Sequence, residues 1–191
     1  MIRTGETIQN KITGERITFL ATSADTDGGA VVIECTVQPN GAVAAAHVHP
    51  AQTERFAVSS GTLGLKAGGK KLTLGSGEVA VVEPGTKHKF WNAGDETVTF
   101  VCEIRPALQF ESLLETMFAL ANDGKTNREG MPMNPLRLAP IAKAHFDTVR
   151  LPFPPAWMQA LALAVGAPLG RALGYGATYV SEAGEPAVAT A

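Results

Sequence analysis

The stretch "HVHPAQTE", residues 47–54, places two histidines on alternate positions and a glutamate five residues after the second. Side chains two apart on a β-strand point to the same face, so His47 and His49 project together. The residues "PAQT" allow the chain to turn, and Glu54 can then return a carboxylate to the same point from the next strand. An H-x-H pair alone is a weak signal, because a strand histidine is usually a surface or satisfied interior residue. The surrounding residues therefore decide between a metal site and the polar face of a strand.

A fourth ligand would have to come from elsewhere in the sheet. His88 is a candidate among the 4 histidines, because it lies in "PGTKHKFWN", just after a turn and at the start of another predicted strand. Three imidazole nitrogens and one carboxylate suit iron, manganese, nickel, copper or zinc better than calcium or magnesium. The predicted cofactor is therefore a divalent transition metal.

Turn signals recur at short intervals up to about Pro106, with runs of alternating or β-branched residues between them. The runs predicted as strands are "ERITFLAT", "AVVIECTVQ", "TERFAVSSG", "TLGLKA", "KKLTL", "EVAVVE", "KHKFW" and "ETVTFVCEI". Many short strands in a short segment are typical of an antiparallel sandwich or barrel. Cys35 and Cys102 fall inside two of these runs, where we expect small buried thiols.

Residues 41–92 resemble the two motifs of the cupin superfamily, specifically of the small single-domain conserved-barrel cupins. The first motif is glycine, five residues, H-x-H, three or four residues, glutamate, six residues and glycine. It is met by Gly41, His47, His49, Glu54 and Gly61. The second motif runs glycine, five residues, proline, one residue, glycine, two residues, histidine, three residues and asparagine. It is met by Gly77, Gly85, His88 and Asn92, but Glu83 stands at the proline position and Pro84 follows it, which puts the local turn geometry in question.

The resemblance implies an antiparallel β-barrel or jelly roll, a double-stranded β-helix, over residues 1–106. It also implies that the metal is held inside the barrel, near one mouth, by His47, His49, Glu54 and His88. Small-barrel interiors can enclose one small ligand. Counting by twos from Glu54 places Phe56 and Val58 on the ligand face, and counting from His88 places Phe90 there. These three side chains are the predicted wall of the substrate pocket.

The pattern changes after Pro106, and residues 107–180 are predicted to form a helical extension packed on the barrel. Apolar residues from Phe110 to Ala121 recur at helical spacing. A second helix opens with Asn134 as cap and proline at the first helical position, and Pro140 should kink or shorten it. A third helix, roughly residues 155–173, is apolar all round and needs cover on more than one side, so we expect a homodimer. Residues 181–191 are predicted to be a flexible tail.

Two further polar features are expected to have no role in the metal site. Glu103 and Arg105 share a strand face opposite Phe100 and Cys102, and the apolar face is the better candidate for the barrel interior, so we expect an exterior pair. His145 follows Ile141 by four residues, and we expect a capping or partly buried residue rather than a fifth ligand.

Four protein ligands leave one or two coordination positions on a metal that favours five or six. The first hypothesis is a metal-dependent oxidoreductase in the manner of dioxygenase cupins, acting on a small enolic or aromatic substrate. Glu54 is the predicted catalytic residue, releasing the metal during turnover and serving as a base. The alternatives are a metal-dependent isomerase or lyase, which uses the ion as a Lewis acid, and a non-catalytic cupin that binds a small ligand.

Composition excludes other classes of function. At 191 residues the chain can form one domain with an extension, and its net charge of −2 with dispersed lysines and arginines gives no nucleic-acid surface. The uncharged residues 151–170 contain four prolines that leave about fourteen residues of continuous apolar helix, short of the roughly 20 that span a membrane. The first ten residues lack the apolar core of a signal peptide, so a cytoplasmic location is expected.

Overall fold

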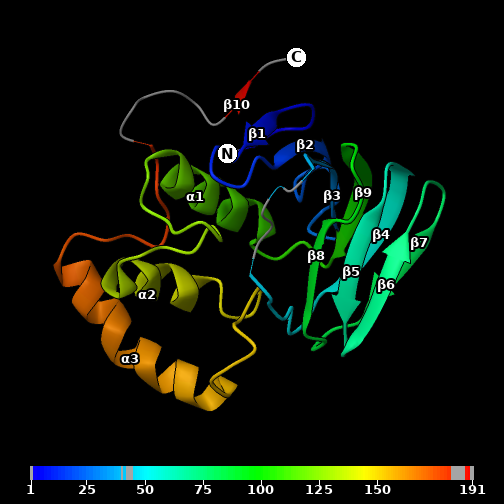
Figure 1. Ribbon diagram of the computed structural model, residues 1–191. Helices are drawn as coiled ribbons and strands as arrows, with labels where there is room; N and C mark the ends of the chain where they lie inside the picture. Colours follow the sequence, from blue (N-terminus) through cyan, green and yellow to red (C-terminus); the bar gives the residue numbers. More distant parts are fainter. Residues whose placement is uncertain (1, 40, 42–44, 182–187, 190–191) are drawn as a thin grey trace.

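The computed structural model describes residues 2–39, 41, 45–181 and 188–189, in which a β-sheet domain leads into a helical extension (Figure 1). The strands are β1 (Thr7–Gln9), β2 (Arg16–Ala21), β3 (Val31–Val37), β4 (Thr53–Ser60), β5 (Leu63–Ala67), β6 (Lys70–Leu74), β7 (Val79–Val82), β8 (His88–Asn92), β9 (Val98–Arg105) and β10 (Val188–Ala189). The helices are α1 (Phe110–Asn122), α2 (Pro135–Ala144) and α3 (Ala156–Ala172).

The strands divide into two antiparallel sheets. One has the order β10-β1-β2-β3-β9-β4-β7 and the other has the order β6-β5-β8. The ring of Phe90 on β8 lies 5.5 Å from Phe56 on β4 and 5.4 Å from Phe100 on β9, so the sheets pack face to face around an aromatic core. This is the predicted jelly roll, and no ladder of hydrogen bonds closes the described strands into one continuous barrel.

Every predicted strand run forms a strand, and in most of them buried residues alternate with more exposed ones as the pleat requires. In β9, for example, Val98, Phe100, Cys102 and Ile104 are buried and the residues between them are not. Glu103 and Arg105 form an ion pair on the outer face, as expected. Strands β1 and β10 were not predicted, since each is short, and β10 forms by pairing with β1 at the other end of the chain.

The predicted tail, residues 181–191, lies mostly outside the described residues. Ser181 donates a hydrogen bond from Oγ to Asp123 Oδ1 at 2.6 Å. Val188 and Ala189 form β10, which pairs with β1. The described part of this segment is therefore attached to the fold rather than loose.

The three helices lie beside the jelly roll, with α2 between α1 and α3 (Figure 1). Phe110 and Phe118 of α1 join the core of the sheets. Asn134 caps α2 by accepting hydrogen bonds from the N–H groups of Leu136 and Arg137, as the sequence predicted. No helix in the described part of the chain has both the length and the apolar character needed to cross a bilayer.

Helix α2 continues through Pro140 to Ala144, although proline there was expected to kink or shorten it. Pro140 has no N–H to donate to the Leu136 carbonyl. Gly170 of α3 packs against that carbonyl so closely that an added Cβ would lie 2.2 Å from the oxygen. The neighbouring helix therefore covers the backbone group that the proline leaves without its usual partner.

Candidate metal centre

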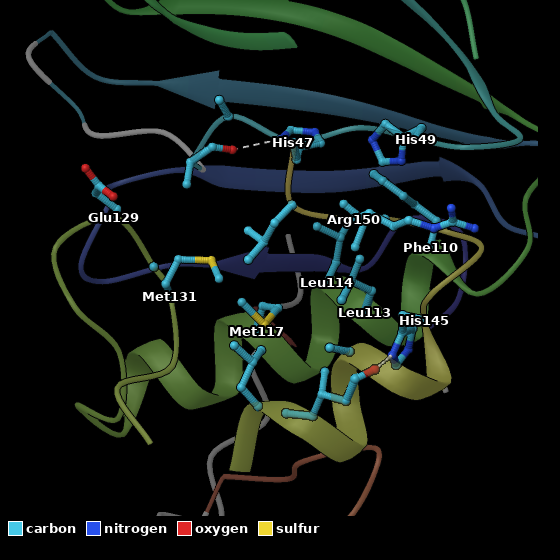
Figure 2. A pocket seen from close by; sticks show the side chains of 18 of the residues that line it. His47, His49, Phe110, Leu113, Leu114, Met117, Glu129, Met131, His145 and Arg150 are labelled. Carbon is cyan, nitrogen blue, oxygen red and sulfur yellow. Dashed lines mark hydrogen bonds between the residues drawn. The ribbon is translucent and has the colours of Figure 1, made fainter. Parts of the chain in front are cut away.

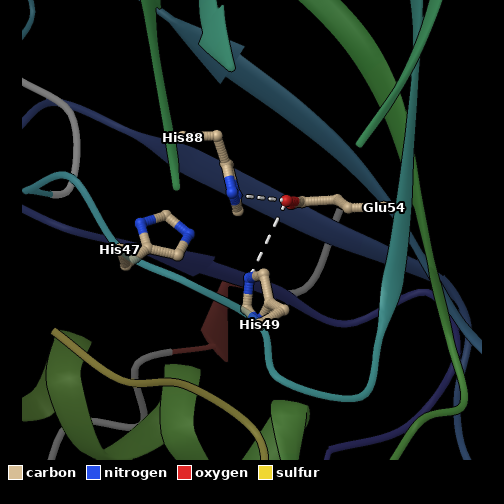
Figure 3. Close-up of side chains that lie close together, drawn as sticks. All are labelled: His47, His49, Glu54 and His88. Atoms are coloured by element: carbon tan, nitrogen blue, oxygen red, sulfur yellow. Dashed lines mark ion pairs between the residues drawn. The ribbon is translucent and has the colours of Figure 1, made fainter. Parts of the chain in front are cut away.

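The backbone brings the two histidine segments together. His47 and His88 form an antiparallel bridge in which each N–H donates to the other's carbonyl at 3.0 Å. His49 lies two residues further along the same segment, and Glu54 lies on β4 between β7 and β9. The four side chains point toward one another (Figure 3).

The turn before His88 accommodates the departure from the second motif. Thr86 N–H donates to the Glu83 carbonyl at 3.2 Å, so Pro84 and Gly85 occupy the central positions of a turn. Gly85 has φ +77°, and proline followed by a residue with positive φ is the pattern of a type II turn. Gly85 N–H also donates to the His49 carbonyl at 2.8 Å. The shifted proline therefore still fixes His88 against His49.

The four side chains form one compact cluster. One ligand atom from each of His47, His49, Glu54 and His88 lies within 4.8 Å of the others. Glu54 Oε2 is 2.8 Å from His88 Nε2 and 3.7 Å from His49 Nε2. Two ligands held at right angles about 2.1 Å from one ion lie about 3.0 Å apart, so this spacing is close to that of ligands around a single metal.

The orientation of the three imidazoles also fits a metal. His47 Nδ1 lies 2.9 Å from the Ala45 carbonyl, His49 Nδ1 lies 2.6 Å from the Thr148 carbonyl, and His88 Nδ1 lies 2.9 Å from the Thr86 carbonyl. A carbonyl can only accept, so each Nδ1 carries a proton, and Nε2 keeps its lone pair whenever the ring is neutral. His49 Nε2 is buried without a hydrogen-bond partner, and His88 Nε2 and Glu54 Oε2 face each other at 2.8 Å. A metal ion bound between these atoms would accept their electron pairs.

Two groups outside the cluster hold the ligands in place. Cys102 donates a hydrogen bond from Sγ to Glu54 Oε1 at 3.2 Å, which leaves Oε2 directed at the histidines. The Thr148 carbonyl, which orients His49, belongs to the segment after α2, and Val48 pairs with Arg150 of the same segment. The helical extension therefore builds part of the site.

Electrostatics favour the states that bind a cation. Burial, followed by the neighbouring His49 and His88, lowers the pKa of His47 to about 3, so this imidazole is neutral. Burial alone would raise the pKa of Glu54, but its contact with His88 and the nearby His49 outweigh burial and lower the pKa to about 2. Burial alone would lower the pKa of His88, but its contact with Glu54 outweighs burial and raises the pKa. At neutral pH the cluster thus contains an ionised carboxylate, the neutral imidazole of His47 and an imidazole, His88, whose proton a bound metal ion would displace.

A cavity of about 510 Å³ opens from the cluster into the space between the sheets and the helices. His47, His49 and Glu54 line it, together with the predicted wall residues Phe56 and Phe90. Val58, which was predicted on the same wall, is buried in the core and is not part of the lining. It lies one step further along β4, beyond Phe56, where the Phe100 ring fills the interior.

Residues 33–103 match the family model of the cupin domain. The jelly roll of this chain therefore contains a cupin domain. It is similar to solved structures of a predicted oxalate decarboxylase from Thermotoga maritima (19% identity, TM-score 0.47, 56% of this chain and 98% of the other) and of KdgF from a Halomonas species (19%, 0.45, 52% and 84%). A protein with a double-stranded β-helix domain from Klebsiella pneumoniae is also similar (26%, 0.43, 56% and 78%). No curated protein sequence matches the chain significantly.

This cupin has a second buried carboxyl in the same cavity, which the sequence interpretation missed. Glu15 is 6% exposed and lines the cavity just before β2. Burial, with a smaller contribution from Glu54, raises its pKa to about 7. The sequence contained a signal for this position, because Glu15 lies two residues before Ile17 and therefore has the same parity as the inward-facing Ile17 and Phe19. Glu15 can therefore exchange a proton with a bound molecule near neutral pH.

Three other titratable groups that line the cavity, His145, Cys35 and Cys102, are structural. His145 is 1% exposed and ends α2, where Nδ1 donates to the Ile141 carbonyl at 2.8 Å, so the predicted capping role is confirmed. Burial lowers its pKa. Cys35 and Cys102 are buried free thiols, as predicted. The hydrogen bond from Cys102 to Glu54 had no local sequence signal, since it joins β9 to β4.

Proposed function

We propose that this cupin is a metal-dependent oxidoreductase that acts, in the manner of a dioxygenase, on a small enolic or aromatic substrate. One observation carries the proposal: His47, His49 and Glu54, three of the four side chains of the cluster, line a cavity rather than lying in a sealed core. A site with four protein ligands at a cavity wall keeps positions open for a substrate, whereas a structural site is closed. The buried thiols of Cys35 and Cys102 are consistent with a reducing, cytoplasmic setting.

His47, His49, Glu54 and His88 would hold the metal, which we propose is divalent iron, manganese, nickel, copper or zinc. The bound ion would supply Lewis acidity and, in the redox-active cases, electron transfer. The protein supplies the rest. The carbonyls of Ala45, Thr148 and Thr86 hold the imidazoles in the ligating tautomer. The apolar walls exclude water, which strengthens electrostatic interactions inside the cavity. Glu54 is our candidate base for the proton that an enol loses on binding.

The overall reaction balances with dioxygen as the oxidant. The carbon–carbon double bond of an enolate breaks, one oxygen atom of O₂ ends in a new ketone or aldehyde, and the other ends in a carboxylate. Two carbon atoms are oxidised and both oxygen atoms are reduced, so no external electron donor is required.

Glu15 favours a second candidate, a metal-dependent isomerase or lyase. Isomerisation and elimination move a proton between carbon and a base, and a base with pKa near the operating pH is the most effective. Glu15, with a pKa raised to about 7, lies on the cavity wall, while Glu54 is ionised. Two carboxyls with separated pKa values in one cavity can divide the roles of base and metal ligand.

The test begins with elemental analysis of the purified protein, followed by oxygen uptake with a panel of diketones, catechols and hydroxy-ketones. Substrate-dependent oxygen uptake that His88→Ala abolishes supports the oxidoreductase. Turnover without oxygen, lost in Glu15→Gln, supports the isomerase or lyase instead. A spectral change of the bound metal with these ligands, but no turnover, indicates a non-catalytic binding protein. Absence of any bound transition metal contradicts all three.

A further inference from the structure

The cavity is much larger than a metal and a small polar substrate need. Its volume of about 510 Å³ lies within the roughly 300–1,000 Å³ of sites that hold drug-sized ligands. The jelly roll forms one wall with Ile17, Ile33 and the three core phenylalanines. The extension forms the opposite wall with α1 and α2 (Figure 2).

The wall formed by the helices is apolar but incompletely packed. Leu113, Leu114 and Met117 of α1 point into the cavity, yet each is only half-buried. Leu138 of α2 and Leu163 of α3 line the cavity in the same half-buried state. An apolar side chain that faces an unfilled cavity gains less free energy from burial than one in a packed core. An apolar molecule that filled the cavity would supply the missing contacts.

We propose that the extension and the jelly roll together form a chamber for a lipophilic ligand. Its oxygen-chelating head lies at the His47, His49, Glu54 and His88 cluster, and its apolar chain or ring system lies against α1 and α2. This inference rests on the proposed function for the head and adds the class of substrate: an amphiphilic molecule with one chelating end and an extended hydrocarbon body. The chamber walls supply affinity in proportion to the apolar area they cover.

The test uses straight-chain hydroxamates from acetohydroxamate to dodecanohydroxamate, which share one bidentate oxygen head. Calorimetric titration of the metal-loaded full-length protein measures their Kd. The chamber predicts that affinity increases about fourfold per methylene until the space is filled. Ala142→Phe, which fills the chamber from α2, should move the plateau to shorter chains. Met117→Trp, which fills the chamber from α1, provides the same test if Ala142→Phe does not fold. Val81→Phe, on the outer face of β7, is the matched control and should leave the plateau unchanged.

The outcomes separate the two proposals. If acetohydroxamate binds but affinity does not change with chain length, the chamber is wrong and the metal site stands. If Ala142→Phe and Met117→Trp both leave the dependence of affinity on chain length unchanged, the chamber proposal is also wrong. If the protein takes up no metal and binds no hydroxamate head, the proposed function fails and the chamber proposal fails with it.

A separate observation concerns the outer face of α3. Only Ala167 and Gly170 of this 17-residue helix are buried. Gly166 and Gly170 face α2, where they lie against Ala139 and Leu136, while large apolar residues recur every four positions on the outside. This outer ridge consists of Trp157, Leu161, Val165, Leu169 and Leu173, which are between 53% and 68% exposed. An outward apolar ridge is the reverse of the pattern of a surface helix.

We infer that the ridge pairs with the same ridge of a second copy of this chain. Residues four apart form the ridges that interdigitate when two helices cross at about −50°, so the ridge is self-complementary about a two-fold axis. With Phe153 and Met158 beside it, the ridge covers on the order of 800 Å² per copy, which is the size of a stable interface. A membrane surface is a poorer occupant, because Arg171 is the only basic residue of α3 and an interfacial helix needs a basic flank.

Light scattering after size exclusion, at micromolar concentration, tests the pairing. The wild-type protein should be a dimer and Val165→Glu a monomer of unchanged melting behaviour. Val81→Glu on β7, where valine is 50% exposed, is the matched control and should remain a dimer. A monomeric wild type, a dimer that survives Val165→Glu, or wild-type protein that binds to anionic vesicles would each overturn the inference.

Discussion

Replacing Cys102 by alanine should weaken metal binding without removing a ligand. Cys102 Sγ donates to Glu54 Oε1 over 3.2 Å, and both residues are at most 3% exposed, so the bond is shielded from bulk water. A hydrogen bond to a charged acceptor contributes about 1.5–3 kcal/mol, and the thiol is a weak donor, so the lower value applies. About 1.5 kcal/mol corresponds to a tenfold increase in the metal Kd. Loss of a partner that orients a ligand typically has an effect of this size.

Cys35→Ala is the matched control, because Cys35 is an equally buried free thiol that also lines the cavity. It lies on β3, and its substitution removes the same atoms without touching Glu54. Competition with a chromogenic chelator measures the Kd of each variant, and thermal unfolding measures the common loss of packing. Cys102→Ser keeps a donor and should recover most of the affinity. Equal Kd values for Cys35→Ala and Cys102→Ala would refute the role of the hydrogen bond.

Three other predictions follow from the structure. His49→Ala and His88→Ala should each lower the metal content and the melting temperature of the isolated protein, and unchanged values of both would contradict the ligand assignment. The raised pKa of Glu15 means that its folded form retains a proton that the unfolded chain loses above pH 4.5, so stability falls as pH rises from about 4.5 to 7. Glu15→Gln should remove that dependence. At pH 8 the free energy of unfolding, measured with urea, should then differ between the variant and the wild type by up to about 3 kcal/mol. Gly170→Ala should destabilise the protein by about 1–3 kcal/mol despite its better helix propensity, because the new Cβ meets the Leu136 carbonyl. Gly166→Ala, whose Cβ meets only Ala139 at 3.1 Å, should be close to neutral, and a Gly170→Ala protein as stable as this control would show that the helix contact is looser than described.

The sequence determined most of the local structure and the four residues of the metal cluster. Alternation of apolar residues placed the strands, because a half-buried strand has a period of two that is visible in a short window. Parity indicated that His47 and His49 share a face, and the resemblance to the two cupin motifs implied the full set of His47, His49, Glu54 and His88. The cap at Asn134 was equally local. Val58 shows the limit, because parity gives the face of a strand but not where along the strand a cavity ends.

Only the tertiary structure decided what surrounds the cluster. The bond from Cys102 to Glu54, the carbonyl of Thr148 behind His49 and the closing of the chamber by α1 and α2 all join segments that are far apart in the chain. Continuation of α2 through Pro140 depends in the same way on Gly170 of another helix. The sequence records which residues are apolar or polar, whereas the distance between two packed elements depends on every side chain at their contact. For that reason the four residues of the cluster could be predicted from the sequence, and the size of the cavity beside it could not.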